Sequence, residues 1–173
     1  YLEGQLENID KCDTLFELFE IKDELIREKY LRPEKTRAPK PGNRASAPMK
    51  FVSSDGISVF VGKNNRQNDA LTLQTAKSEN LFLHAKNIPG SHVIVDFEGE
   101  PPETTLREAA MLAAYFSQAR SSAGVPVDYT PRKFVKKPSG ARPGMVIYST
   151  NRTLYVTPEA AAVQRIKEHS REE

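Results

Sequence analysis

Apolar residues recur at helical spacing in the first thirty residues of the chain. Leu2, Leu6 and Ile9 stand at positions i, i+4 and i+7, which predicts an amphipathic helix. The pattern stops at Lys11–Thr14, where either the aspartate or the threonine can cap a second helix. Neither helix has an evident partner in the sequence, so we expect residues 1–31 to end a helical arm or another domain. The second stripe consists of Leu15, Leu18, Phe19, Lys22, Leu25, Ile26 and Lys29.

The residues after position 49 show the alternation and the turn signals of short strands. Lys50–Ser53 and Ile57–Gly62 flank Asp55-Gly56, a dipeptide typical of a type I′ turn, in which both central residues have positive φ. We therefore predict a β-hairpin at this place. The other predicted strands are Leu81–Ala85, His92–Phe97, Val125–Tyr129, Lys133–Lys136 and a second hairpin, in which Met145–Ser149 and Thr153–Thr157 meet around Asn151.

Capping signals place two helices among these strands. Asn68 or Asp69 is predicted to cap a short helix, because both side chains accept hydrogen bonds from free helical N–H groups. Thr105 and Glu108 have the spacing of a capping box and are predicted to open a helix that runs to about Ser121. The small side chains of this helix allow it to lie close to a sheet. These residues are Ala109, Ala110, Ala113 and Ala114.

Strands joined mainly by hairpins, with one main packed helix, indicate an α+β domain on a mostly antiparallel sheet. Residues 32–49 contain four prolines and few apolar groups, which is typical of an extended linker. Pro158 can start a C-terminal helix at the favoured first position. We therefore divide the chain into helices at 1–31, a basic proline-rich linker at 32–49, the α+β domain at 50–158 and a C-terminal helix or tail at 159–173.

Charge is strongly segregated along the chain. Residues 1–31 carry nine acids and four bases, a net charge of −5. Residues 32–50 carry six bases and one acid, a net of +5, and residues 120–152 carry seven bases and one acid, a net of +6. Basic blocks of this density attract polyanions, because binding releases the counterions that surround a polyanion. Two such blocks beside one small domain favour a polyanion-binding function over an incidentally basic surface.

The composition excludes several other classes. Cys12 is the single cysteine, so the chain forms no internal disulfide and no cysteine-based zinc site, which suits a reducing compartment. No apolar run approaches the ~20 residues that span a membrane, and no signal peptide is visible. The chain begins at Tyr1, and we expect it to be a part of something longer.

Six motifs in one order resemble the NFACT-R domain, which lies near the C-terminus of the family that includes bacterial RqcH and eukaryotic NEMF. Streptococcal members of this family are also called fibronectin-binding proteins. The resemblance covers about residues 50–158, and residues 1–31 are similar to the end of the coiled-coil region that precedes the domain. Phe82 stands where the family often has Trp, a change that keeps an aromatic ring. The motifs are Gly62–Thr72, Phe82–Ala85, Pro89–Val93, Glu108–Ala110, Val125–Thr130 and Lys136–Gly144.

The resemblance implies a non-catalytic RNA-binding module without a cofactor. Family members bind the large ribosomal subunit and tRNA during the rescue of stalled translation, so a cytoplasmic, ribosome-associated protein is expected. The alternative that the family name suggests is a fibronectin-binding adhesin, exported to the cell surface without a visible signal. Neither alternative involves insertion into a membrane.

Candidate RNA-binding residues follow from charge and from hydrogen-bonding capacity. The proline- and glycine-flanked bases are suited to contact phosphates, which positions RNA and carries little sequence information. The amides and the guanidinium of the 64–69 loop are suited to unstacked bases and 2′-hydroxyls, although capping is the simpler role for such a loop. Tyr129 is the better stacking candidate of the two tyrosines in predicted strands. The full set is Asn65, Arg66, Gln67, Tyr129, Arg132, Lys133, Lys136, Lys137 and Arg142.

Two histidines and one serine raise the question of catalysis. His84 and His92 are predicted to lie near each other at strand ends. No nearby cysteine completes a ligand set, and zinc requires about four donors, so we expect buried, hydrogen-bonded histidines. Ser91 lies in no recognisable nucleophile elbow. The sequence therefore predicts no hydrolase.

Overall fold

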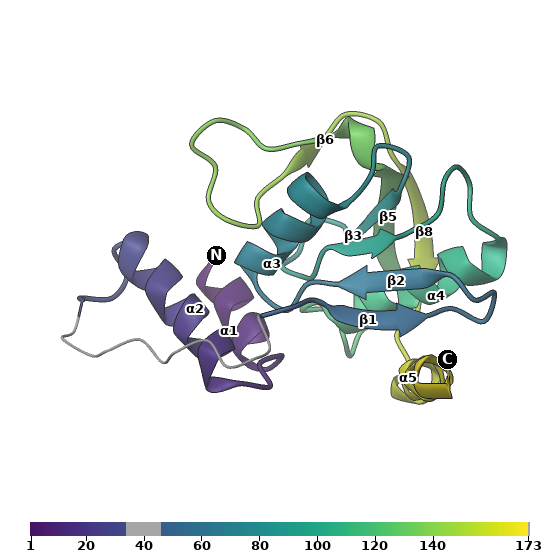
Figure 1. Cartoon of the computed structure of the whole chain (residues 1–173), viewed down its shortest axis with the longest axis horizontal. Helices are drawn as coiled ribbons and strands as arrows, with labels where there is room; N and C mark the ends of the chain where they lie inside the picture. The colour runs from purple at the N-terminus through teal and green to yellow at the C-terminus, as the bar shows by residue number, and fades with distance from the viewer. Residues whose placement is uncertain (34–45, 173) are drawn as a thin grey trace.

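The computed structural model describes residues 1–33 and 46–172, so most of the predicted linker lies outside the described residues. Its centre is a six-stranded sheet with the order β1-β2-β4-β3-β5-β8, in which all neighbouring strands are antiparallel (Figure 1). This arrangement confirms the predicted α+β class. The strands of the sheet are β1 (Met49–Val52), β2 (Ser58–Val61), β3 (Leu81–Ala85), β4 (Val93–Val95), β5 (Val125–Pro131) and β8 (Arg152–Val156).

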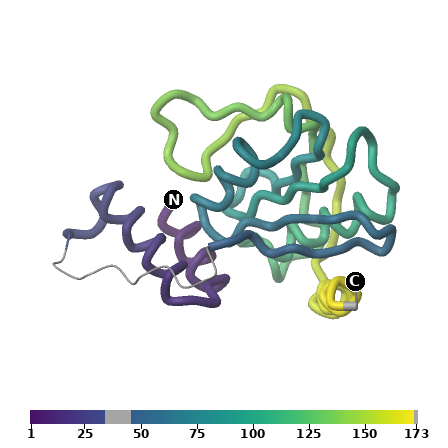
Figure 2. Tube along the Cα trace, viewed as in Figure 1, coloured from purple at the N-terminus to yellow at the C-terminus, as the bar shows by residue number. Residues whose placement is uncertain are grey.

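Helices and a small ribbon surround this sheet. The helices α4 (Glu103–Tyr115) and α5 (Ala160–Glu172) lie in the predicted alanine-rich and C-terminal segments. α4 ends six residues before the predicted Ser121, and α5 begins two residues after Pro158, so these two predicted bounds are wrong. A tube view shows α1 and α2 at one end of the domain and α5 near β1 (Figure 2). The remaining elements are α1 (Leu2–Ile9), α2 (Leu15–Arg27), α3 (Asn65–Asp69), the π-helix η1 (Ala70–Thr75), the 3-10 helix η2 (Arg132–Phe134), and the paired strands β6 (Val135–Lys136) and β7 (Ile147–Tyr148).

The first hairpin forms with a different turn from the predicted one. β1 and β2 pair from Met49↔Val61 to Val52↔Ser58. In the turn only Gly56 has a positive φ, of 76°, so the type I′ prediction is wrong. The N–H of Gly56 donates to the carbonyl of Ser53, which describes a type I turn followed by a left-handed glycine. Such a turn requires glycine at one position only.

One face of the sheet packs against α4 through very small side chains. Ala109, Ala110, Ala113 and Ala114 are fully buried against the valines and leucines of β2 to β5, as predicted. These methyl groups let the helix approach the sheet closely, and the larger Leu112 of the same helix is also fully buried in this core. α4 thus covers this face of the sheet, while its outer side carries the exposed Arg107–Glu103 pair.

The N-terminus of α4 is capped from the first hairpin, and the predicted capping box is wrong. Asp55 accepts hydrogen bonds from the N–H and the hydroxyl of Thr105, at 3.1 and 2.6 Å. Glu108 accepts hydrogen bonds from the N–H and the hydroxyl of Ser54. The carboxylate that accepts a hydrogen bond from the first turn of the helix therefore belongs to Asp55, which is distant in the sequence. A local sequence pattern could not predict this contact.

The other face of the sheet carries a second, smaller core. Phe82 and Ile94 project from this face and pack against Leu71 of η1 and Val135 of β6. β7 pairs with β6, while β8 pairs with β5 at the edge of the main sheet. The predicted hairpin around Asn151 is therefore wrong, because the two strands belong to different sheets.

The short helix α3 starts four residues earlier than predicted. Asn64, in an extended conformation, accepts a hydrogen bond from the N–H of Gln67 and caps the helix. Asn68 and Asp69 are not the caps. Asn68 accepts a hydrogen bond from the N–H of His92, and Asp69 accepts one from the N–H of Gly144. Both side chains bind loops that follow much later in the chain.

His92 is buried in the second core and is neutral. Its Nε2 lies 3.0 Å from the carbonyl oxygen of Gly144, which can only accept, so Nε2 carries the proton. Nδ1 then accepts from the hydroxyl of Thr72, at 2.8 Å. Burial lowers the pKa of His92 to about 3, and its ring stands edge-on to Phe82. The prediction of a buried, hydrogen-bonded histidine is confirmed, and His84 lies 5.5 Å away between ring centroids.

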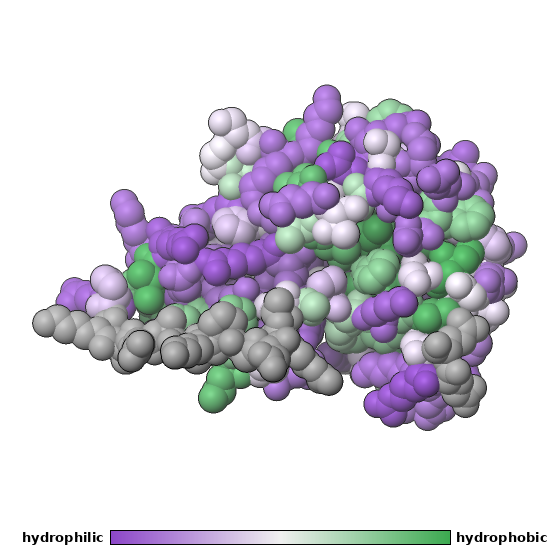
Figure 3. Space-filling model, viewed as in Figure 1, coloured by the Kyte–Doolittle hydropathy of each residue, from purple (hydrophilic) through white to green (hydrophobic). Residues whose placement is uncertain are grey.

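The two N-terminal helices pack against the domain through polar residues, contrary to expectation. Leu2, Leu6 and Ile9 are 50%, 64% and 41% exposed, whereas Gln5 and Asn8 on the opposite face of α1 are buried. In the space-filling view, hydrophilic side chains dominate the surface over α1 and α2 (Figure 3). The inner residues of this helical pair are Gln5, Asn8, Lys11, Glu17, Ile21 and Glu24.

A buried ion pair joins α2 to the loop before α3. Lys63 contacts the carboxylate of Glu17, and their side chains are 10% and 3% exposed. Asp13 provides a second, exposed carboxylate 3.0 Å from the Lys63 ammonium. Burial acts to lower the pKa of Lys63, but hydrogen bonds to Glu17 and Asp13 outweigh it and leave this pKa raised.

We expect a Glu17→Gln substitution to lower the free energy of unfolding by about 2 kcal/mol, because it leaves Lys63 partly uncompensated. Glutamine retains the capping acceptor that Glu17 gives to Thr14. Glu20→Gln is the matched control, since within residues 1–33 and 46–172 Glu20 accepts a hydrogen bond from the neutral amide of Asn64, at 3.1 Å, and pairs with no buried cation. Urea unfolding measures both variants, and equal losses would show that the ion pair does not hold the helices.

Protonation of His92 is expected to make stability depend on pH. The folded-state pKa lies below the unfolded value, so the unfolded chain binds the proton first as the pH falls. Stability should therefore decrease below about pH 6.5, by about 2 kcal/mol between about pH 7 and about pH 5. The His92→Gln protein lacks this contribution and should show a flatter dependence in denaturant unfolding. Parallel curves for the two proteins would contradict the assignment.

Candidate nucleic-acid interface

The 62–69 loop is held in place by its own amides. The Gln67 Oε1 accepts from the N–H of Lys63 at 2.9 Å, and Gln67 is 5% exposed. Asn68 occupies the space beside Gly62, where a Cβ would collide with the asparagine side chain. Gln67, one of the predicted RNA-binding residues, therefore has a structural role within the loop. Asn65 and Arg66 are the members that face outward from it.

Asn65 and Arg66 meet the acidic face of α2. The Asn65 Nδ2 donates to Glu24 at 2.8 Å, and the Arg66 guanidinium pairs with Asp23. Both side chains of the Arg66–Asp23 pair are 34% exposed. A carboxylate therefore occupies the position at which a phosphate would contact Arg66.

The loop between β6 and β7 returns over α3 toward the start of α1 (Figure 1). Two contacts to Asp69 hold it: Lys137 pairs with this carboxylate, and the N–H of Gly144 donates to it at 3.0 Å. Gly144 has a φ of +78°, and a Cβ there would lie 2.6 Å from the Asn65 Oδ1. Lys136 is exposed and makes no ion pair within residues 1–33 and 46–172.

Arg142 lies at the end of this loop beside two aromatic rings, Tyr1 and Tyr30, that stack on each other. Its guanidinium carbon is 4.8 Å from the ring centroid of Tyr1 and 5.6 Å from that of Tyr30. Its Nε lies 3.2 Å from Glu28, the C-cap of α2, and the side chain is 41% exposed. The sequence pattern missed Tyr1 and Tyr30 because only the docking of the helices brings them to the loop.

The neighbouring bases serve different purposes. Arg132 donates to the carbonyls of Thr72 and Leu73, at 2.7 and 2.9 Å, and so closes the end of η1. Lys133 is exposed, with its ammonium 2.9 Å from Glu79. Exposed pairs of this kind are weak and are screened by salt. Lys133 remains available to a phosphate, whereas Arg132 is structural.

Tyr129 lies apart from the other candidates. It pairs with Leu83 across the strands and belongs to the core on the α4 face. There it lines a cavity of about 330 Å³ that also contains Glu79 and Glu100. Tyr148 lies on the opposite face beside Phe82, and its hydroxyl donates to Asp128 at 2.9 Å. Tyr148 is therefore the strand tyrosine on the side of the basic loop.

A cavity of about 550 Å³ opens between α1, the β3–β4 loop and the β6–β7 loop. Its sixteen lining residues include Arg142 and two histidines and no carboxylate. Burial lowers the pKa of His84, which disfavours a charged ring in this cavity. The residues that define the cavity chemically are Tyr1, Asn8, Asn65, His84, Asn87, His92, Arg142 and Tyr148.

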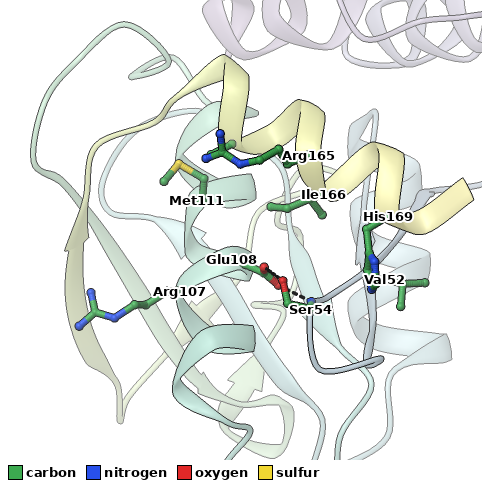
Figure 4. A pocket seen from close by; sticks show the side chains of 9 residues that line it. Val52, Ser54, Arg107, Glu108, Met111, Arg165, Ile166 and His169 are labelled. Atoms are coloured by element: carbon green, nitrogen blue, oxygen red, sulfur yellow. Dashed lines mark hydrogen bonds between the residues drawn. The ribbon is translucent and has the colours of Figure 1, made fainter. Parts of the chain in front are cut away.

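A second cavity, of about 410 Å³, lies between α4 and α5 (Figure 4). Arg107, Arg165 and His169 surround it, but Glu108 is bound to Ser54 in its interior, which disfavours a phosphate. The Nε2 of His169 is buried there without a hydrogen-bond partner in the described part of the chain. This cavity is distant in sequence from every predicted RNA-binding residue.

Ser91 and its surroundings do not form a nucleophilic site. Ser91 is completely buried, and its hydroxyl accepts from the Lys11 ammonium at 3.0 Å. Burial lowers the pKa of Lys11 to about 8. Among residues 1–33 and 46–172, no three His, Cys, Asp or Glu side chains are grouped to hold a metal ion. In the same ranges no helix has the length and apolar character that crossing a membrane requires.

Known proteins resemble this chain over most of its length. Rqc2 homolog RqcH from Bacillus subtilis is 45% identical over 152 residues, which cover 87% of the chain and 26% of that protein. Rqc2 homolog RqcH from Streptococcus suis is 41% identical over 94% of the chain and 30% of that protein. The chain therefore spans less than a third of these relatives.

A solved structure, the C-terminal part of the fibronectin/fibrinogen-binding protein from Streptococcus suis, has the same fold. The TM-score is 0.84 at 39% sequence identity, and the match covers 96% of this chain and 66% of that one. The family described as NFACT protein RNA binding domain matches residues 48–149. This range contains the strands β1 to β5 of the sheet, the 62–69 loop and the basic β6–β7 loop, and it ends before β8. The chain belongs to the NFACT RNA-binding-domain family.

Proposed function

We propose that this chain is the part of an RqcH-type ribosome quality-control factor that binds the large ribosomal subunit and tRNA during the rescue of stalled translation. One observation carries the proposal: residues 132–144 contain five bases and no acid, and they lie on the exposed ribbon and loop over the second core. Membership in an RNA-binding-domain family supports RNA as the polyanion.

The bases of this segment differ in how readily they reach a phosphate. Lys133 and Lys136 are exposed, and the one carboxylate bound to them, Glu79, is itself 49% exposed. Arg66 and Arg142 carry partners on α2 and must exchange Asp23 and Glu28 for phosphates. The first two lysines therefore provide the initial contacts, and their contribution decreases with salt.

The proposed activity is binding and positioning, without catalysis. Lysine contacts to phosphates orient a nucleic acid and do not select a sequence. The buried serine and the neutral histidines support a structural role for the residues that could suggest an enzyme. The site of action is the ribosome in the cytoplasm.

Replacement of Lys133 and Lys136 by Gln should weaken tRNA binding by about tenfold at low salt and reduce the salt slope by about 1.5, because two phosphate contacts are lost. Fluorescence polarisation with labelled tRNA, across a salt series, measures both quantities. The matched control is Arg165→Gln with Lys167→Gln on α5, which removes the same charge near the opposite face of the sheet. Equal losses in the two double variants would show that only net charge matters.

A second candidate function, favoured by the name of the Streptococcus suis structure, is binding of fibronectin at the cell surface. A dedicated contact would persist when the salt is raised from about 50 to about 200 mM, unlike counterion-driven binding. Surface plasmon resonance on immobilised fibronectin tests this with the Lys133/Lys136 double variant. We expect the wild-type chain to bind fibronectin weakly, and we expect this binding to be lost at the higher salt concentration. Salt-resistant binding, combined with absent tRNA binding, would favour the adhesin.

A further inference from the structure

We infer that the 550 Å³ cavity beside Arg142 receives one unstacked nucleobase of the bound RNA, with preference for a base that carries an exocyclic amino group. This inference rests on the proposed RNA-binding function and names the part of the RNA that the site recognises.

Size and charge of the cavity suit a nucleotide. Small-molecule sites commonly have volumes of about 300–1,000 Å³, and this cavity falls in that range. The cavities of about 410, 330 and 610 Å³ each have a glutamate in their lining (Glu79, Glu100, Glu103 or Glu108), while this one has none and has Arg142. Its lining therefore favours an anion more than theirs does.

Ring and apolar surfaces in the cavity suit the faces of a base. His84 and Tyr148 both border the cavity, and both lie beside the ring of Phe82. Ile88, Pro89 and Met145 add apolar surface from the two loops. Single-stranded RNA is recognised mainly by stacking of unstacked bases on such side chains, together with hydrogen bonds to base edges.

A chain of amides leaves one acceptor free at the cavity. Glu24 can only accept, so Gln5 and Asn65 turn their NH₂ groups toward it, at 2.6 and 2.8 Å. Their oxygens then face Asn8, whose Nδ2 donates to both, at 3.3 and 3.4 Å. The Oδ1 of Asn8 consequently points elsewhere and accepts no hydrogen bond from any described residue.

Asn8 is 3% exposed as a whole residue and lines the cavity, so its Oδ1 is an acceptor at the cavity wall. A base that donates to this oxygen makes a direct hydrogen bond to the protein. The exocyclic amino groups of adenine, cytosine or guanine can donate to it, while uracil has no amino group and donates only through its ring N3–H. Asn87, at the mouth, has an exposed side chain without a hydrogen bond in the described part of the chain, and it adds a second polar contact.

The test is an NMR titration of the full chain with three probes: adenosine 5′-monophosphate, uridine 5′-monophosphate and ribose 5-phosphate. We expect AMP to shift the backbone amides of Asn87, Gly90 and Gly144 and the side-chain NH₂ of Asn8. UMP should bind about fivefold more weakly, because it has no exocyclic amino group and its one base donor, N3–H, is flanked by two carbonyl oxygens that the Asn8 oxygen repels. Ribose 5-phosphate should affect only the signals around Arg142.

Two variants test the two proposed polar contacts of the base. Asn8→Leu removes the acceptor and should abolish the difference between AMP and UMP. Asn87→Gly is compatible with the local φ of +56° and should weaken both nucleotides without unfolding the loop. The wild-type titration alone remains decisive if the Asn8 variant does not fold.

Equal shifts from AMP and ribose 5-phosphate, or AMP shifts confined to other residues, would overturn the inference even if the basic segment binds tRNA. The proposed function fails in a different way, through tRNA binding that is absent or independent of Lys133 and Lys136. AMP binding at the named amides, with weaker UMP binding, supports the base site in either case.

Discussion

The buried carboxylate of Glu24 is the contact on which the polar half of the structure depends. A single oxygen of Glu24 accepts from the Tyr1 hydroxyl, the Gln5 amide and the Asn65 amide, at 2.8, 2.6 and 2.8 Å. Tyr1 precedes α1, Gln5 lies within α1, and Asn65 lies in α3. One charge on α2 therefore connects α2 to both α1 and α3. Hydrogen bonds to a buried charge are strong, and removal of the charge would leave several donors unpaired. Because Glu24 can only accept, it also sets the orientation of every amide around it, and through them that of Asn8.

Around this contact, acids of α2 and of its C-cap balance bases of the domain. Glu17, Asp23 and Glu28 pair with Lys63, Arg66 and Arg142 respectively. The partners differ in burial: the Glu17–Lys63 pair is enclosed, whereas the other two pairs are partly open to solvent. Electrostatic attraction between partly exposed groups is weak and exchangeable. The helices thus hold to the domain through the enclosed pair and leave guanidinium groups that a phosphate can engage at modest cost.

The antiparallel sheet separates structural from functional chemistry. On one face, alanines of α4 pack directly on valines and leucines, and Tyr129 belongs to that core. On the other face, Phe82 and His92 support η1 and the ribbon of β6 and β7, from which the basic loop projects. His92 connects η1 to the β6–β7 loop, because its ring is hydrogen-bonded to the hydroxyl of Thr72 on one side and to the carbonyl of Gly144 on the other. A neutral histidine can do this since one nitrogen donates and the other accepts.

Local features of the sequence determined the fold class, the first hairpin, the alanine-rich helix and the buried state of His92. Each depends on residue spacing or on the chemistry of one side chain, which a short window contains. Caps and pairings over long distance were decided by tertiary structure: Asp55 caps α4, Asn64 caps α3, and β8 joins the main sheet. The sequence also identified Lys133 and Lys136 as exposed bases, but it could not place Tyr1, Tyr30 or Asn8 at the site. Their positions depend on α1 turning its polar face inward, with Leu2 and Leu6 outward. Hydrophobic periodicity predicts the opposite orientation, and only the hydrogen bonds and ion pairs made on docking reverse it.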